Sequence, residues 1–242
     1  MKPVIGVPLR YQKLNDGRAI VYMSERLRRT LQKAGAFVYP ISPVQDVDYI
    51  YTRGNEFEEL TDSEKLDIYS SLDICDGVLF PGGLKFTPYD RYLLEVCIEK
   101  KIPVLGICLG MQMMSCYNQD VSLGDVEGDV IHDQKDDDLS LVHKVKVDKN
   151  SKLYNIIGKN EILVNSFHNH CACENSVYVI TARSEDGVIE GIEYPSNVFN
   201  IGVQWHPEIS YEFDEPSKKL IDAFIQAAVV RKEERIKVSE RI

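Results

Sequence analysis

The chain has 242 residues, a formal net charge of −10 at pH 7 and 44% hydrophobic residues. This composition is typical of a soluble globular protein with a full core, and the negative charge argues against nucleic acid or a membrane surface as the main partner. The opening residues contain prolines and an arginine, unlike a signal peptide, and no segment has the ~18 apolar residues of a membrane span. The six cysteines are scattered, so we expect reduced thiols and a cytoplasmic location.

Short apolar runs alternate with helical patterns in the first half of the chain. Asp62 or Ser63 is expected to cap the second helix. Strand–helix alternation with apolar strands predicts a parallel sheet that is covered on both faces. We expect strands at 3–8, 36–42, 77–83 and 102–107, and helices at 21–35, 62–72, 91–101 and 110–117.

The pattern changes after about residue 118, where the sequence becomes acidic and only partly periodic. The Asp136–Asp138 run is expected to be a solvated loop, and an amphipathic helix is expected at 215–238 with a frayed tail after about 231. With no repeat and no linker, we expect 1–242 to form one α/β domain with a mostly parallel central sheet flanked by helices. Shorter strands are expected at 142–147, 162–164, 177–182, 188–193 and 198–205.

A cysteine stands between two glycines where the fourth strand meets the next helix. The segment "GICLG" (106–110) has the form of a nucleophile elbow, in which a sharp turn presents the central side chain. The positive end of the following helix would favour the thiolate of Cys108. Taken alone, a cysteine that only packs in the core is an equally good interpretation.

A histidine and a glutamate follow the last strand in "GVQWHPE" (202–208). A thiolate nucleophile needs a base within hydrogen-bond reach, and the base needs an orienting partner. With Pro207 between them, His206 and Glu208 can point the same way. A lone histidine here would more often lie at the surface or cap a helix, but both features at strand ends favour a catalytic set with Cys108.

"GICLGMQ", the upstream "FPGG" and "GVQWHPE" together resemble the class I (triad) glutamine amidotransferase superfamily, which has a flavodoxin-like fold. The resemblance covers nearly the whole chain. It implies that Cys108 is the nucleophile, His206 the general base and acid, and Glu208 its orienter, and that acyl transfer proceeds through a γ-glutamyl thioester. It also implies an oxyanion hole from the backbone N–H groups of Gly83 and Leu109, and it implies no cofactor.

Three further segments resemble the γ-glutamyl hydrolase branch, which includes γ-glutamyl-γ-aminobutyrate hydrolases that act without a synthase partner. They are "MKPVIGVP" at the start, "LVNSFHNH" (163–170) and "SEDGVIEGIE" (184–193). This resemblance implies a small-molecule γ-glutamyl substrate. The residues that it adds as glutamyl or oxyanion contacts are Gly82, Gln112, Ser166, His168 and Asn169.

The chain departs from this branch around the double glycine. Lys85 stands where the branch usually has an aspartate, Leu109 stands where it often has an arginine, and the loop before Arg91 is shorter. We therefore expect a site mouth that is more open and less negative, and a preference for an anionic leaving group.

Several alternatives stay open. The chain could be a glutaminase subunit that delivers ammonia to a separate synthase, or a catalytically silent binding member of the fold, although its complete triad argues against the latter. A homodimer is also left open. The segment "HNHCAC" (168–173) suggests a metal, but adjacent strand positions alternate faces and no second ligand cluster is evident, so we expect none.

Overall fold

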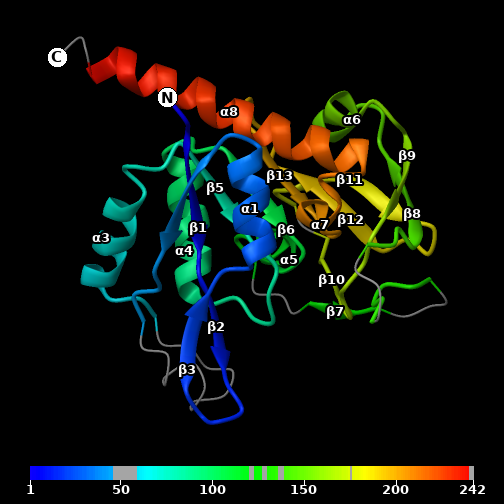
Figure 1. The fold of residues 1–242 in the computed structure, drawn as a ribbon, viewed down its shortest axis with the longest axis horizontal. Helices are drawn as coiled ribbons and strands as arrows, with labels where there is room; N and C mark the ends of the chain where they lie inside the picture. Colours follow the sequence, from blue (N-terminus) through cyan, green and yellow to red (C-terminus); the bar gives the residue numbers. More distant parts are fainter. Residues whose placement is uncertain (46–58, 120–122, 127–129, 136–138, 175, 240–242) are drawn as a thin grey trace.

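The computed structural model describes residues 1–45, 59–119, 123–126, 130–135, 139–174 and 176–239 (Figure 1). One nine-stranded sheet runs through these residues. In spatial order its strands are β4 (Phe37–Ile41), β1 (Val4–Pro8), β5 (Gly77–Phe80), β6 (Val104–Ile107), β13 (Asn200–Val203), β12 (Ile189–Glu193), β11 (Val179–Ser184), β8 (His143–Val147) and β9 (Glu161–Val164).

The sheet has a parallel part and an antiparallel part. Strands β4, β1, β5, β6 and β13 are parallel, and β12, β11, β8 and β9 extend the sheet by antiparallel pairing. The predicted single-domain α/β fold with a large, mostly parallel central sheet flanked by helices is confirmed. Parallel pairing of β5, β6 and β13 matters most for function, because it brings their carboxyl ends to one edge.

Helices cover both faces of the sheet, as the apolar strands predicted. On one face lie α1 (Glu25–Lys33), α6 (Lys152–Ile157) and α8 (Glu215–Ser239), and on the other lie α3 (Asp62–Ser71), α4 (Pro88–Glu99) and α5 (Leu109–Ser115). Side chains of β5 alternate between the two cores: Val78 and Phe80 face the second group of helices, whereas Leu79 faces the first. The short helix α7 (Pro207–Ser210) follows β13.

Two small antiparallel pairs lie outside the main sheet. β2 (Arg10–Lys13) and β3 (Ala19–Tyr22) form a hairpin that projects from the body of the molecule at the bottom of Figure 1. β7 (Gly124–Asp125) pairs with β10 (His170–Cys171). The sequence patterns did not predict either pair, and the helix predicted at 21–35 begins only at Glu25, because Val21 and Tyr22 pair with β2.

Several helix ends differ from the prediction for identifiable reasons. Thr61, rather than Asp62 or Ser63, caps α3 through a capping box with Glu64. α4 begins at Pro88, three residues before the predicted start, because Pro is well suited to a first helical position. α8 spans Glu215–Ser239, which agrees with the helix predicted at 215–238, and the fraying predicted after about 231 stays a prediction.

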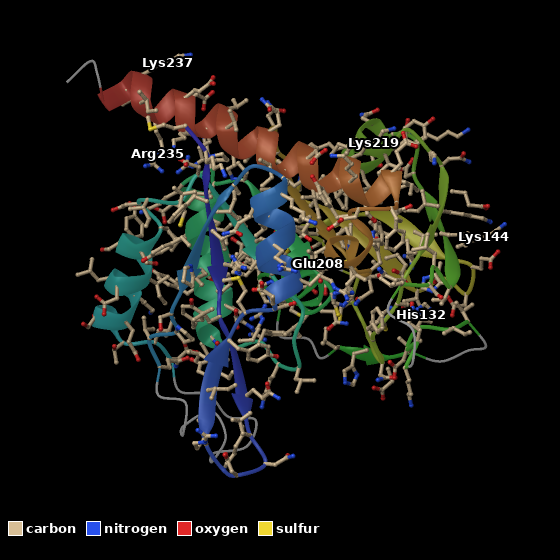
Figure 2. All side chains as sticks on the ribbon, in the orientation of Figure 1. His132, Lys144, Glu208, Lys219, Arg235 and Lys237 are labelled. Atoms are coloured by element: carbon tan, nitrogen blue, oxygen red, sulfur yellow. The ribbon has the colours of Figure 1, made fainter. Side chains whose placement is uncertain are left out.

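The C-terminal part of α8 is anchored to the body of the protein. The Arg235 guanidinium donates to the carbonyl of Cys75 at 3.0 Å and pairs with Asp76 at 3.1 Å. Figure 2 shows Lys219 toward the start of α8 and Arg235 and Lys237 toward its end. None of the helices in the described part of the chain has the length and apolar character of a membrane span. The loop predicted at 136–138 lies outside the described residues.

Candidate active site

Cys108 occupies a strained position directly after β6. It is the N-cap residue of α5, with φ 52° and ψ −107°, a region that residues other than glycine rarely adopt. Hydrogen bonds hold the turn on both sides: the Cys108 N–H donates to Val203 O at 2.9 Å, and the Gln112 N–H donates to Cys108 O at 3.0 Å. The turn also needs Gly110, because a Cβ there would lie 2.2 Å from Phe80 O.

His206 and Glu208 form a hydrogen-bonded pair after β13. The His206 Nδ1–H donates to Glu208 Oε1 at 2.7 Å, so the other ring nitrogen is left for the thiol. Burial lowers the pKa of His206, but the charge of Glu208 and the interaction with Cys108 outweigh burial and raise that pKa well above its ordinary value. The arrangement therefore favours a protonated His206 beside the sulfur of Cys108.

Two residues that the sequence analysis did not single out hold His206 in place. The side-chain amide of Asn165 donates to His206 O at 2.9 Å and accepts from the His206 N–H at 2.8 Å. The ring of Phe167 lies edge-on to the imidazole, with 5.6 Å between centroids. Both residues belong to the segment "LVNSFHNH", which the sequence analysis had already related to the γ-glutamyl hydrolase branch. The sequence alone did not indicate which positions of that segment face His206.

The double-glycine turn after β5 approaches the same site. A Cβ on Gly82 would lie 2.8 Å from Cε1 of His206, so only glycine fits there, and a Cβ on Gly83 would lie 3.1 Å from Leu109 Cδ2. The structure thus brings Gly82, Gly83 and Leu109 together with the triad. As the first residue of α5, Leu109 has an N–H without an intrahelical acceptor.

Arg10 holds this turn from the hairpin. Its guanidinium donates to Pro81 O at 2.7 Å and to Gly82 O at 3.3 Å, and it pairs with Asp90 at 2.6 Å. Because carbonyl and following N–H point in opposite directions across a trans peptide, fixing Gly82 O toward Arg10 turns the Gly83 N–H away from it. Arg10 is a functional residue that sequence reasoning missed.

A cavity of about 290 Å³ lies in front of His206 and Glu208. The glycine turn lines one side, and residues 22–27 at the base of the hairpin and the start of α1 line another. The site therefore places a cysteine at a strained turn, a hydrogen-bonded histidine and glutamate, and a cavity at the carboxyl ends of β5, β6 and β13, which is where open α/β sheets bind ligands. Cys108 itself is not among the residues that line this cavity.

Comparison with known proteins identifies the family of the chain. Residues 87–208, half of the chain, match the family model described as Peptidase C26. The chain belongs to the Peptidase C26 family. This is a class I glutamine amidotransferase-like family, as the resemblance of the motifs implied, whereas the γ-glutamyl hydrolase branch is not distinguished by the match.

Relatives of this Peptidase C26 chain include a protein named as a putative glutamine amidotransferase and a CTP synthase. The "Putative glutamine amidotransferase PB2B2.05" of Schizosaccharomyces pombe is 38% identical over 139 residues, which are 55% of this chain and 53% of that protein. CTP synthase of Staphylococcus aureus is 27% identical over 94% of this chain and 45% of its own length. The chain thus spans about half of each of these two relatives. A glutamine amidotransferase structure from Thermotoga maritima, 15% identical, shares the fold over 96% of this chain and 98% of its own, with a TM-score of 0.56.

Four other residues predicted for the site engage different partners. The Gln112 amide donates to His170 O at 2.7 Å, and the Ser166 N–H donates to Gln134 Oε1 at 2.7 Å. His168 is buried among other histidines, and Asn169 is exposed and donates to Asp133 at 3.4 Å. None of the four lines the cavity beside His206, so their contact with a glutamyl group stays a prediction.

The segment "HNHCAC" is divided between two environments. His168 points into the protein, whereas His170 is exposed and pairs with Asp125 at 3.0 Å. Cys171 and Cys173 are half-buried thiols. The segment therefore does not form one cluster of ligands.

Proposed function

We propose that this Peptidase C26 member hydrolyses the amide bond of γ-glutamyl compounds, releasing glutamate and an amine-bearing product. One observation carries the proposal: the strained turn of Cys108 lies against a half-buried His206 whose Nδ1–H donates to Glu208 at 2.7 Å. This is the arrangement that an activated thiolate nucleophile requires.

In the first half of the reaction, the Cys108 thiolate attacks the γ-carbonyl carbon of the bound substrate. A C–S bond forms, and the carbonyl oxygen becomes an oxyanion that would accept hydrogen bonds from the Gly83 and Leu109 N–H groups. The imidazolium of His206 then gives its proton to the nitrogen of the leaving group. The C–N bond breaks, the amine departs, and a γ-glutamyl thioester remains on Cys108.

In the second half, neutral His206 takes a proton from a water molecule that attacks the thioester carbon. The C–S bond breaks, glutamate leaves, and the proton remains on His206, which restores the ion pair. Glu208 contributes in both halves by stabilising the imidazolium and by fixing the ring through its hydrogen bond.

A second function has a specific observation in its favour. The relationship to CTP synthase extends over 94% of this chain and under half of that enzyme. A chain of this kind would release ammonia from glutamine and pass it to a synthase. The chemistry on Cys108 would be the same, and only the leaving group and the dependence on a partner would differ.

Activity of the isolated protein distinguishes the two functions. We expect the purified chain to release glutamate from a γ-glutamyl amine at a rate at least about tenfold above its rate on glutamine, with Cys108→Ala as the blank. Cys116→Ala is a matched control, since Cys116 ends the same helix and is also buried. A chain that is idle alone but turns over glutamine when a synthase is added would contradict the hydrolase and support the subunit.

A further inference from the structure

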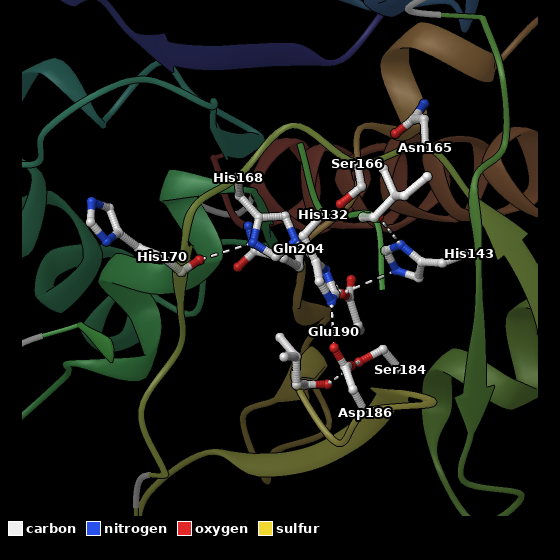
Figure 3. A network of polar contacts seen from close by, with 12 residues as sticks. His132, His143, Asn165, Ser166, His168, His170, Ser184, Asp186, Glu190 and Gln204 are labelled. Atoms are coloured by element: carbon white, nitrogen blue, oxygen red, sulfur yellow. Dashed lines mark hydrogen bonds and ion pairs between the residues drawn. The ribbon is translucent and has the colours of Figure 1, made fainter. Parts of the chain in front are cut away.

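Three histidines surround a fully buried glutamate beside the candidate active site (Figure 3). Glu190, on β12, has no exposed surface, and His132, His143 and His168 are each no more than 5% exposed. The histidines come from segments far apart in the sequence: 130–135, the start of β8 and the loop after β9. The reaction proposed above uses none of these side chains, so their burial together needs another explanation.

Hydrogen bonds on the outer side of each ring fix its tautomer. The Nδ1 atoms of His143 and His168 lie 2.9 Å from the carbonyl oxygens of Ile131 and His170, which can only accept, so both nitrogens carry hydrogen. Nε2 of His132 lies 3.1 Å from the carboxylate of Asp186 and donates likewise. In the neutral rings the inner nitrogens therefore present lone pairs: Nδ1 of His132, and Nε2 of His143 and of His168.

The inner atoms converge on one point. His132 Nδ1 and His168 Nε2 are 3.2 Å apart, and they lie 3.4 Å and 3.6 Å from Glu190 Oε1. Three ligands bound to zinc at about 2.0–2.2 Å lie about 3.3–3.5 Å from one another in tetrahedral geometry. Neither oxygen of Glu190 receives a directed hydrogen bond from the described residues, although the carboxylate is completely buried.

We propose that His132, His168 and Glu190 bind a divalent transition-metal ion, zinc in the first instance, through Nδ1, Nε2 and Oε1. An outer N–H that donates to a carbonyl or carboxylate is the usual support of a metal-bound histidine, and both rings have it. Charge agrees with the proposal. Within the described part of the chain the ion-pair partners of Glu190 and Asp186 are all histidines, so one divalent ion balances the two carboxylates.

His143 would pack against the carboxylate rather than complete the triangle. Its Nε2 lies 3.3 Å from the same Glu190 oxygen. The proposal departs from the sequence expectation of no metal, which considered residues 168–173, because only His168 of that segment contributes. The other two ligands are far from His168 in the sequence: His132 lies 36 residues before it, and Glu190 lies 22 residues after it.

The bound ion would stabilise the support of the catalytic histidine. It would connect the loop after β9 to β12, two segments that hold the end of β13. In that loop Asn165 clamps the backbone of His206, and on β12 Glu190 O accepts from the Gln204 N–H at 3.0 Å. The role is structural, so metal binding is measurable without any assay of activity.

The test is metal binding to the purified full-length chain. After chelator treatment, zinc addition and desalting, we expect about one zinc ion per chain by elemental analysis. Cobalt should give the intense visible bands of a four-coordinate ion with nitrogen and oxygen ligands, and zinc should remove those bands. His132→Asn, His168→Asn and Glu190→Gln should each lower retained zinc to less than about a tenth of the wild-type level.

Variants of neighbouring residues distinguish the three proposed ligands from residues that only surround them. His170→Asn, an exposed histidine two residues from His168, should retain wild-type metal binding. Asp186→Asn and His143→Gln should weaken affinity about 10- to 100-fold without abolishing it. Zinc should raise the melting temperature of the wild type and of His170→Asn but not of Glu190→Gln.

Two outcomes overturn the proposal. If the wild-type chain retains no zinc and gives no cobalt bands, the cluster is a proton-sharing network of imidazolium and carboxylate groups. If His170→Asn loses all metal binding, the metal sits at the surface. Because both measurements use wild-type protein or exposed variants, neither depends on whether a buried variant folds.

Discussion

Cys108 combines an unfavourable backbone conformation with a side chain that can be shortened at no steric cost. A residue other than glycine at φ 52° costs on the order of 1 kcal/mol or more, and the surrounding hydrogen bonds maintain it. Lys101 and Asn118 also have positive φ angles, of 53° and 56°, so the strain at Cys108 indicates a functional requirement only together with its place beside His206.

We predict that Cys108→Ala folds normally and lowers turnover by at least about 10³-fold, because the nucleophile is lost while the backbone of the turn is preserved. Steady-state kinetics and thermal unfolding measured on the same preparation check this. Cys116→Ala is the matched control and should keep its activity. Turnover of the Cys108 variant within about tenfold of wild type would show that the sulfur is not the nucleophile.

The Glu208 carboxylate should set the alkaline limit of activity. The imidazolium of His206 protonates the leaving amine, and it is lost as pH rises through the His206 pKa, which Glu208 and Cys108 raise above 6.5 against the effect of burial. Glu208→Gln removes the charge, so the alkaline limb of the kcat/KM profile should move to lower pH.

The corresponding control is Glu212→Gln, because Glu212 is an exposed carboxylate a few residues further along the chain. Its alkaline limb should stay at the wild-type position. If Glu208→Gln left the limb in place as well, the charge of Glu208 would not govern the protonation of His206.

At the scale of elements, the β2–β3 hairpin supplies a residue that shapes the glycine turn. Arg10 is buried and connects Asp90, at the start of α4, to the carbonyls of Pro81 and Gly82. We predict that Arg10→Lys lowers kcat by about tenfold or more with a smaller change in KM, because lysine keeps a positive charge near Asp90 but not the planar fork.

Arg18→Lys is the control within the same hairpin. Arg18 is exposed and pairs only with Asp16 in the structure, so its replacement should leave both kinetic constants unchanged. Equal kinetics for Arg10→Lys and wild type would show that the turn holds its shape without the guanidinium.

The loop after Gly83 is short because α4 begins early. The Asp90 carboxylate accepts hydrogen bonds from the N–H and hydroxyl of Thr87, and this fixes the end of the loop, whereas Lys85 is exposed. We predict that Lys85→Glu lowers kcat/KM for an anionic γ-glutamyl conjugate by about two- to fivefold and raises it for a cationic one, the scale of a solvent-exposed charge.

Lys149→Glu, an equally exposed lysine in another loop, controls for the change in net charge. If Lys85→Glu and Lys149→Glu change kcat/KM for the two conjugates to the same degree, Lys85 has no particular role at the site mouth. The overall electrostatic field of the protein would then account for the effect.

The sequence predicted the positions of helices and strands better than it predicted the contacts between residues far apart in the chain. Apolar runs and helical spacing located the strands of the sheet and its covering helices except α6, because burial imposes those periods on the chain itself. The β2–β3 hairpin was missed because its strands are only partly buried, so they have no clear apolar pattern. The last residues of β3, 21 and 22, were therefore assigned to the helix predicted at 21–35. The cap of α3 was misplaced by one residue, since Thr61, Asp62 and Ser63 are all good cap residues and only the contact with Glu64 distinguishes them.

The same contrast holds for the candidate site. The elbow and "GVQWHPE" predicted Cys108, His206 and Glu208 as the triad because each motif follows an apolar strand; the structure brings these residues together, and their catalytic roles stay a proposal. Arg10, Asn165 and the Glu190 cluster were not predicted, because their partners lie 22 to 80 residues away and only the topology of the sheet brings them together.

For the whole molecule, the strand order explains how one surface collects residues from three distant parts of the chain. β5, β6 and β13 are neighbours in the sheet, with Phe80 beside Gly106 and Ile107 beside Val203. The glycine turn, the nucleophile and the base therefore follow three adjacent strands. The proposed substrate is a small molecule, so the net charge of −10 is expected to contribute to the solubility of the protein more than to binding of the substrate.

The most direct test of the account is to identify the sulfur that carries the acyl group. Burial raises the pKa of Cys75 to about 12 and that of Cys97 well above its usual range, so these thiols stay protonated and slow to react near neutral pH. The purified chain would be mixed briefly with a γ-glutamyl substrate, or with a glutamine-like chloroketone, quenched in acid, and examined by intact-mass and peptide mass spectrometry. We expect one adduct, on the peptide that contains Cys108, and none in Cys108→Ala. An adduct on Cys171 or Cys173 in the wild-type protein would contradict the assignment of Cys108 as the nucleophile.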